Sequence, residues 1–215
     1  MRALAIIPAK RHSTRLPGKN YLEVGGETLV ARAVAVAKQA KHYSLVHDIV
    51  VSFDEPHESL SRLTGVTLFQ RKTAPVTTLQ VVQEVLAEEA YAGADIVCLL
   101  LASSPLRTFR NLVESRIRLH DGCPLVLSVI PFVGATLLAM TGPSQLHVRT
   151  TRHGRSGYRD FVHCGTALWA RTGWINQARS WYDASPIEAY VTRGNVVDVN
   201  TYADFNAALH LIQPD

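Results

Sequence analysis

Residues 3–40 of the chain are ALAIIPAKRHSTRLPGKNYLEVGGETLVARAVAVAKQA. The stretch opens with a short apolar run at 3–7, which is typical of a buried parallel strand, and continues through a basic loop rich in turn residues. It closes with an alanine-rich segment at 28–40, where Thr28 can cap a helix. A strand, a loop and a helix in this order indicate the first unit of an α/β fold.

The same rhythm continues along the chain. Apolar runs predict strands at 48–52, 66–70, 95–101, 124–130, 161–170 and 195–200, and other segments predict helices after Pro56 and at 77–93, 108–121, 173–182 and 202–212. This alternation indicates a doubly wound, mostly parallel sheet with helices on both faces. We expect a single domain, residues 1–215, with its ligand site beyond the carboxyl ends of the strands.

Composition limits the classes of function. Hydrophobic residues make up 47% of the 215, which is enough for a full core and too much for a disordered chain. The chain has 22 Lys and Arg against 18 Asp and Glu, and this net charge of +4 comes without the dense basic run typical of nucleic-acid binders. Three cysteines without metal-like spacing, and a start that lacks a signal peptide, predict reduced thiols in a cytoplasmic protein.

The segment 131–160 interrupts the alternation. The uncharged stretch 124–142 is nearly long enough to span a bilayer, but Pro131 and Gly134 break it, so we expect no membrane helix there. The second half of the segment is polar and basic. The segment could be an arm, a dimerisation insert or a lid.

The loop after the first apolar run concentrates positive charge. Four cationic side chains fall within ten residues: Lys10, Arg11, Arg15 and Lys19. Cations and free backbone N–H groups at the end of a strand can bind a polyphosphate, and cations also stabilise the charge that shifts when pyrophosphate leaves. The loop has neither the GxxxxGK[ST] nor the GxGxxG pattern. On composition alone, a solvated basic surface loop is an equally good explanation.

Four blocks of the chain resemble one enzyme family. IIPAKRHSTRLPGKN at 6–20 strongly resembles the opening pattern I-P-A-R-x-x-S-x-R-L-P-x-K-N of the CMP-sialic acid synthetases, the acylneuraminate cytidylyltransferases, with Lys10 in place of the first Arg. VCLLLASSPLRT at 97–108 resembles the family's L-L-Q-P-T-S-P-L-R-T. FVHCGTALWA at 161–170 and VVDVNTYADF at 196–205 are similar to its N-G-A-I-Y and D-I-D-T-x-x-D. The order and spacing of the blocks agree along nearly the whole chain.

The resemblance implies a nucleotidyltransferase that transfers CMP from CTP to the hydroxyl of a sugar acid, releases pyrophosphate and uses Mg²⁺. It implies catalytic roles for Lys10, Arg15, Lys19 and Asp198. The nucleotide site that it implies consists of Pro8, Ala9, Lys10, Ser13, Arg15, Lys19 and Asn20 in the first loop, Arg71 near the cytosine, and Thr77 and Thr78 after it.

Three positions depart from the family, all on the acceptor or metal side. Leu101 stands where the family has a Gln that contacts the sugar acid, and Cys164 replaces the Asn of its Asn-Gly pair. The two metal-ligating aspartates of the family become Asp198 and Asn200, and the neutral Asn200 predicts weaker Mg²⁺ binding. The implied acceptor site consists of Leu101, Ser103, Ser104, Arg107, Arg152, Arg155 and Cys164.

These departures leave the acceptor open. The family favours a sugar acid, whereas a phosphonate is already anionic, needs no base, and suits arginines such as Arg152 and Arg155. A non-catalytic nucleotide-binding homologue is a third alternative, against which the intact basic loop argues. For Arg107, a structural role is as good an explanation as substrate contact. The family implies that 131–160 is an arm across a homodimer, and we expect neither nucleic acid nor membrane as a partner.

Overall fold

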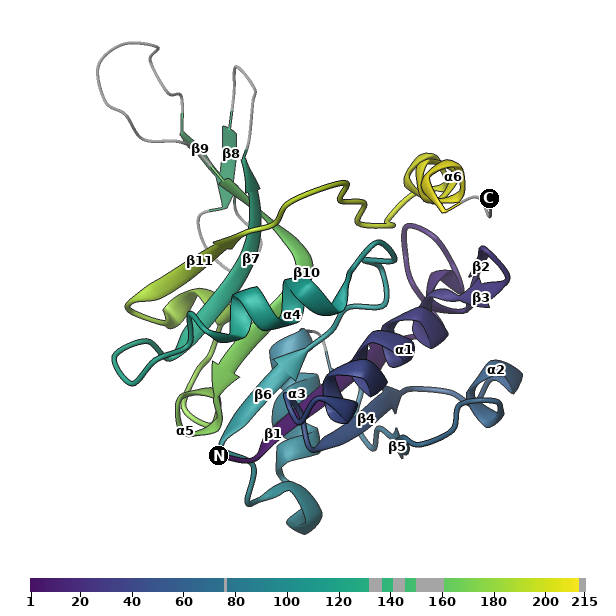
Figure 1. Ribbon diagram of the computed structural model, residues 1–215. Helices are drawn as coiled ribbons and strands as arrows, with labels where there is room; N and C mark the ends of the chain where they lie inside the picture. The colour runs from purple at the N-terminus through teal and green to yellow at the C-terminus, as the bar shows by residue number, and fades with distance from the viewer. Residues whose placement is uncertain (76, 132–136, 141–145, 150–160, 213–215) are drawn as a thin grey trace.

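One seven-stranded sheet forms the centre of the molecule (Figure 1). A computed structural model describes residues 1–75, 77–131, 137–140, 146–149 and 161–212. The strand order is β11-β7-β10-β6-β1-β4-β5, with β1 at Ala3–Ala9, β4 at Asp48–Phe53, β5 at Thr67–Gln70, β6 at Ile96–Leu99, β7 at Leu125–Pro131, β10 at Phe161–Arg171 and β11 at Ile187–Val191. Only β10 runs antiparallel to its neighbours in this sheet, so the prediction of a mostly parallel sheet is confirmed.

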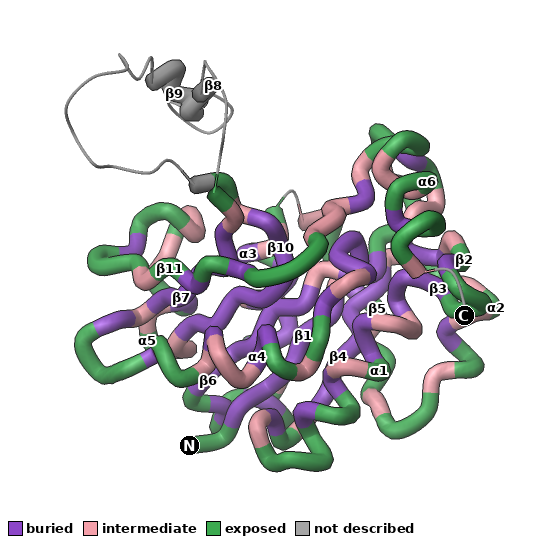
Figure 2. Tube along the Cα trace, turned by 45° about the horizontal axis from the view of Figure 1, so that its top comes forward, coloured by how far each residue is buried: buried purple, intermediate pink, exposed green. Residues whose placement is uncertain are grey.

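Helices cover both faces of the sheet. In Figure 1, α1 (Leu29–His42) and α4 (Phe109–Arg116) lie in front of the strands and α3 (Thr78–Leu86) lies behind them. Two apolar cores result, one between the sheet and α1 with α4, the other between the sheet and α3 with the single-turn α5 (Thr172–Ile175). Figure 2 shows the buried strands enclosed by more exposed outer elements.

Local sequence explains where the helices begin. Thr28 lies just before α1, and its side chain accepts a hydrogen bond from the backbone of Ala31, as the sequence predicts. Thr77 and Thr108 do the same for α3 and α4, each within a reciprocal capping box. The predicted helix after Pro56 is a single turn, α2 (Glu58–Ser61).

Four details of the sequence prediction are wrong. The helices expected at 77–93 and 108–121 end at Leu86 and Arg116, and a separate 3-10 turn at Glu89–Tyr91 follows the first. The helix expected at 173–182 is one turn of α5 plus a 3-10 turn at Trp181–Asp183, which the Ser180 side chain caps anew. The strand expected at 195–200 is irregular chain, because its backbone turns to bond the loop after β6 rather than a neighbouring strand. The edge strand β11 was not expected.

Two smaller hairpins accompany the main sheet. Residues Glu23–Val24 (β2) and Glu27–Thr28 (β3) form a turn beside the last helix, α6 (Tyr202–Leu211). Within the predicted arm, Leu137–Met140 (β8) and Leu146–Arg149 (β9) pair antiparallel in a sheet of their own, which extends beyond the end of β7 in Figure 1. Among the described residues, no helix is long and apolar enough to cross a membrane.

Candidate functional site

The basic loop leaves the carboxyl end of β1 and is folded back by hydrogen bonds from two of its following side chains, Asn20 and Tyr21. Asn20 donates from Nδ2 to the carbonyl of Lys10 at 2.8 Å, and the hydroxyl of Tyr21 donates to the carbonyl of Ala9 at 3.2 Å. Gly18 has a φ of +65°, a conformation that glycine adopts freely, and the 3-10 turn Lys19–Tyr21 follows it. These hydrogen bonds tie the end of the loop to the carbonyl groups at its start.

The four cations of this loop have different surroundings. Arg11 is held by the segment after β4, because its backbone N–H donates to Asp54 Oδ1 at 2.8 Å and its guanidinium donates to the carbonyl of Pro56 at 3.1 Å. Lys10 is exposed. The side chains of Arg15 and Lys19 instead extend to the segment that precedes α6, where both contact the same residue.

That residue is Asn200. Arg15 Nη2 donates to Asn200 Oδ1 at 2.8 Å, and Lys19 Nζ donates to the same oxygen at 2.9 Å. Lys19 Nζ also donates to the carbonyl of Val199 at 2.8 Å. Burial lowers the pKa of Lys19, although the nearby Asp198 carboxylate acts to raise it. The structure thus brings the predicted phosphate loop and the predicted metal block together across about 180 residues of sequence.

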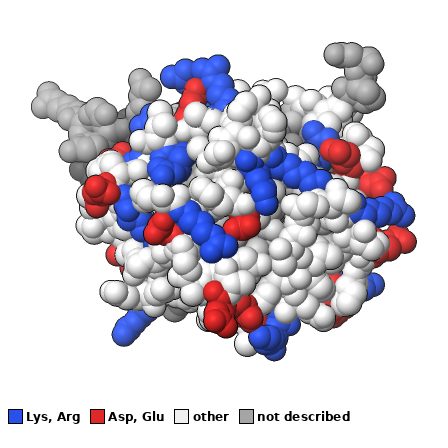
Figure 3. Space-filling model, turned by 60° about the horizontal axis from the view of Figure 1, so that its bottom comes forward, with Lys and Arg blue, Asp and Glu red and all other residues white. Residues whose placement is uncertain are grey.

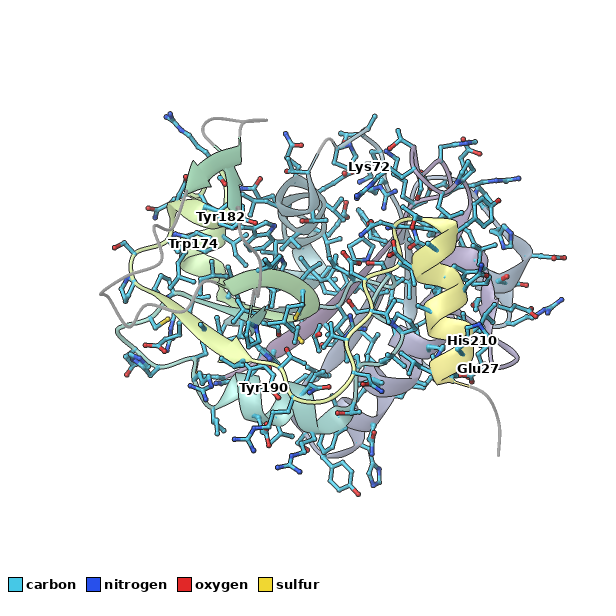
Figure 4. All side chains as sticks on the ribbon, turned by 90° about the horizontal axis from the view of Figure 1, so that it is seen from above. Glu27, Lys72, Trp174, Tyr182, Tyr190 and His210 are labelled. Atoms are coloured by element: carbon cyan, nitrogen blue, oxygen red, sulfur yellow. The ribbon has the colours of Figure 1, made fainter. Side chains whose placement is uncertain are left out.

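The segment 198–200 is fixed from both sides. The backbone N–H of Val199 donates to the carbonyl of Ser103 at 2.8 Å, which ties it to the loop after β6. On the other side, Asp204 Oδ2 accepts from the backbone of Asn200 at 3.0 Å and of Thr201 at 2.8 Å, as part of the capping box of α6. Figure 4 shows α6 lying across this end of the molecule.

Asp198 meets the requirement for one metal-binding carboxylate. Its Oδ2 accepts from Asn200 Nδ2 at 2.8 Å, whereas its Oδ1 is buried and has no hydrogen-bond partner among the described residues. A buried carboxylate oxygen without a partner is costly unless a cation or water completes it, and oxygen is the ligand that Mg²⁺ prefers. In the described part of the chain, no group of three or more His, Cys, Asp or Glu side chains is arranged to hold a metal ion.

Arg107 stabilises the loop that follows β6. It is buried, and its guanidinium donates to the carbonyls of Thr166, Leu101 (2.6 Å) and Gly165 (3.2 Å). Burial lowers the pKa of Arg107 to about 10. Of the two roles that the sequence left open, this geometry provides the structural one.

The two acceptor-side departures, Leu101 and Cys164, lie close together around Gly165 and Ser104. A Cβ built on Gly165, which has a φ of +66°, would lie 3.1 Å from Leu101 Cδ1 and 3.2 Å from Ser104 Oγ. Ser104 Oγ itself donates to the carbonyl of Cys164 at 3.3 Å. Here β10 has an irregularity between His163 and Leu168, which makes room for the loop after β6.

The Cys164 side chain and the Nε2 atom of His163, both near this patch, are closed off from solvent. Cys164 Sγ lies 3.3 Å from the hydroxyl oxygens of both Thr166 and Thr192. His163 Nε2 is buried and has no hydrogen-bond partner among the described residues, and burial lowers the pKa of this imidazole. Both side chains belong to β10. At the position where the resembled family has Asn, Cys164 places a weakly polar thiol.

Arg71 lies at the carboxyl end of β5, where a nucleobase contact was predicted. It is buried, donates from Nη1 to the carbonyl of Ser52 at 2.7 Å, and its Nη2 lies 3.6 Å from Asp54 Oδ2. Its Nε is buried without a hydrogen-bond partner in the described residues. Asp54 also holds the backbone of Arg11, so this carboxylate connects the two predicted nucleotide-binding segments.

The turn after Arg71 is held by α3. Glu84 accepts from the backbone of Lys72 at 2.6 Å and from the hydroxyl of Thr73 at 2.7 Å. The hydroxyl of Thr77 caps α3, and that of Thr78 accepts from the indole of Trp181 at 2.9 Å. Both threonines therefore have structural partners.

The structure brings some of the predicted site residues together and shows further residues that join them. Arg15, Lys19, Asp198 and Asn200 come together, as do Leu101, Ser104 and Cys164, whereas Arg152 and Arg155 lie outside the described residues. Asp54 and Glu84 were not singled out. The position of Asp54 directly after an apolar strand was the available signal, whereas nothing local marks Glu84 within its helix.

The surface in Figure 3 shows basic and acidic side chains interspersed over the face in view.

Comparisons with known proteins give consistent relatives. A family described as "Cytidylyltransferase" matches residues 4–106. The 3-deoxy-manno-octulosonate cytidylyltransferase of Paramagnetospirillum magneticum is 22% identical over 98% of this chain and 97% of its own length. The CMP-N,N'-diacetyllegionaminic acid synthase of Legionella pneumophila is 32% identical over 53% of each protein.

Solved structures show the same fold over nearly the full length. A CMP:2-keto-3-deoxy-manno-octonic acid synthetase complexed with CTP superposes with a TM-score of 0.75 at 18% identity, over 98% of both chains. A 4-diphosphocytidyl-2C-methyl-D-erythritol synthase from Anaerococcus prevotii superposes with a TM-score of 0.71 at 13% identity, over 99% of both. At these identities the likeness establishes the fold.

Proposed function

We propose that the chain is a cytidylyltransferase, which transfers CMP from CTP to a small acidic acceptor and releases pyrophosphate; the match of residues 4–106 to the cytidylyltransferase family model supports this. The observation that carries this proposal is the convergence of Arg15 and Lys19 on the segment 198–200. Two cations and a carboxylate with a free oxygen lie together beyond the carboxyl end of β1, where α/β sheets bind their ligands.

In the proposed reaction, Arg15 and Lys19 bind the phosphate oxygens of CTP. Negative charge moves to the leaving pyrophosphate as the bond at the α-phosphorus breaks, and fixed cations stabilise that charge without reorganising. Asp198 would hold a Mg²⁺ ion, which when bound neutralises phosphate charge and lowers the pKa of an attacking hydroxyl. The attacking oxygen of the acceptor forms the new bond to the α-phosphorus as the bond to the pyrophosphate oxygen breaks, and the proton of an attacking hydroxyl would pass to solvent water.

The acceptor that we propose is a sugar acid. The curated relatives carry names of enzymes for 3-deoxy-manno-octulosonate and N,N'-diacetyllegionaminic acid, and both compounds are acidic sugars. A phosphonate is the second candidate, favoured by the apolar Leu101 at the position where the resembled family has a Gln that contacts the sugar acid. A phosphonate oxygen is anionic near neutral pH, so it needs fewer polar groups for its activation.

Pyrophosphate release from CTP, measured with a panel of sugar acids and phosphonates, tests this proposal. We expect release with at least one sugar acid, and none with CTP alone. Release with phosphonates only would replace the acceptor class and keep the reaction. Binding of CTP without release under any acceptor would support the non-catalytic alternative.

We also propose that the chain is a homodimer. The basis is the apolar first half of the segment 131–160, together with the position of β8 and β9 beyond the main sheet. An interface of obligate size, above about 2,000 Å² in total, is expected. Light scattering at micromolar concentration checks this, and a monomer there would contradict it.

A further inference from the structure

The side-chain amide of Asn200 connects the two cations of the basic loop to the carboxylate of Asp198. Its Oδ1 accepts from Arg15 and Lys19 at 2.8 and 2.9 Å, and its Nδ2 donates to Asp198 Oδ2 at 2.8 Å. Arginine and lysine can only donate hydrogen bonds, and an ionised carboxylate can only accept them. These partners therefore fix which way round the amide lies.

In this orientation the amide oxygen is fully used. A carbonyl oxygen has two lone-pair directions, and two charged donors occupy those of Asn200. A divalent cation at the same oxygen would have to displace one donor and lie beside the positive charge of the other. The buried Oδ1 of Asp198 has no such competitor among the described residues.

From this geometry we propose that Asn200 is a positioning residue and not a metal ligand. It holds Arg15 and Lys19 in place for the phosphate groups, so the site binds CTP even without a divalent ion. The inference rests on the proposed function and deepens it, because it gives a new role to a position that the family uses for metal.

Both cations keep donors for a ligand while Asn200 holds them. A lysine ammonium has three N–H donors, and Lys19 uses two of them, on Val199 and Asn200. An arginine has five donors, and Arg15 gives one to Asn200. Asn200 therefore supports phosphate binding and does not block it.

Asn200 is itself anchored before any ligand arrives. Its backbone N–H donates to Asp204 Oδ2 at 3.0 Å, and the preceding Val199 donates to the carbonyl of Ser103 at 2.8 Å. A preorganised anchor lowers the entropy lost when the nucleotide binds. We therefore expect the effect of removing the amide to appear in CTP affinity.

Calorimetric titration of the full chain with CTP, once with EDTA and once with Mg²⁺, tests the proposal. Asn200→Ala should weaken binding about tenfold or more in both conditions, because two hydrogen bonds to charged groups are lost. Asn206→Ala is the matched control, since Asn206 is exposed on α6, and it should bind as the wild type does.

Other outcomes overturn the proposal. If Asn200→Ala weakens binding only with Mg²⁺, the residue is a metal ligand, and if it tightens binding without metal, the amide competes with phosphate. A wild type that binds CTP only with Mg²⁺ also contradicts the proposal. A wild type that binds CTP in neither condition overturns the proposed function instead, and with it the basis of the inference.

A double-mutant cycle separates positioning from general stability. In an Arg15→Ala background, Asn200→Ala should weaken CTP binding by a smaller factor than in the wild type, because one of its two partners is already gone. A merely structural role would lower the melting temperature and leave the two factors equal. If Asn200→Ala does not fold, Asn200→Ser, which is too short to span from Asp198 to both cations, provides the same comparison.

Discussion

Replacing Lys19 by Ala removes the cation that lies deepest in the proposed phosphate site. Its ammonium bonds Val199 and Asn200, and burial lowers its pKa, so the charge acts in a partly desolvated place. Loss of a charged donor in such a site costs about 2–4 kcal/mol of transition-state stabilisation. This corresponds to a fall in kcat/KM for CTP of about 30- to 900-fold, measured by pyrophosphate release.

The control for this change is Lys72→Ala. Lys72 is an exposed lysine whose ammonium lies 2.6 Å from Glu88 Oε1, and Figure 4 shows it at the surface. Its removal should leave kcat/KM within about twofold, since exposed ion pairs contribute little. Melting curves of both variants show whether Lys19→Ala is folded. A folded Lys19→Ala protein with unchanged kcat/KM would remove the basic loop from the mechanism.

Three further predictions concern stability and selectivity. Gly165→Ala should lower the free energy of unfolding by about 1–3 kcal/mol in denaturant titrations, because of its positive φ and close neighbours, whereas Gly173→Ala, with nothing within 4 Å, should not. The kcat/KM measured with CTP should exceed that measured with GTP by at least about 100-fold, and equal kcat/KM values for the two nucleotides would contradict a cytosine site at Arg71. Glu84→Gln should lower the melting temperature at pH 7; burial acts to raise the pKa of Glu84, but hydrogen bonds from the turn after β5 outweigh it and lower that pKa. A lowered carboxylate pKa stabilises the fold above the unfolded pKa, so this difference should disappear as the pH falls through the lowered value, and a pH-independent difference would contradict it.

The strand pattern was predictable because each central strand is a short apolar run buried on both faces. The runs at 3–7 and 95–101 correspond to β1 and β6, which lie side by side in the middle of the sheet. The edge strand β11 was missed, because its exposed Ile187 and Val191 alternate with less exposed residues and give a weaker signal. The segment 195–200 was wrongly predicted as a strand because it is apolar enough for one. Its backbone instead donates a hydrogen bond to the loop after β6.

The candidate site was predictable in its parts and not in its connections. Charge density marked the loop with Arg15 and Lys19, and the family pattern marked Asp198 and Asn200. No sequence signal states that the amide of Asn200 joins these pairs, because the contact depends on how α6 and the loop after β6 fix the segment. Long-range side-chain contacts of this kind are set by tertiary packing and not by local propensity.

The bond between the basic loop and the segment before α6 also bears on how the molecule is made. Ribosomes synthesise the basic loop about 180 residues before the segment 198–200. A chain stopped after Val191 would contain every strand of the seven-stranded sheet, yet Arg15 and Lys19 would lack their partners on Val199 and Asn200. All residues of the central strands are therefore synthesised before those of the segment 198–200, and a chain that ends at Val191 would lack the groups that hold Arg15 and Lys19.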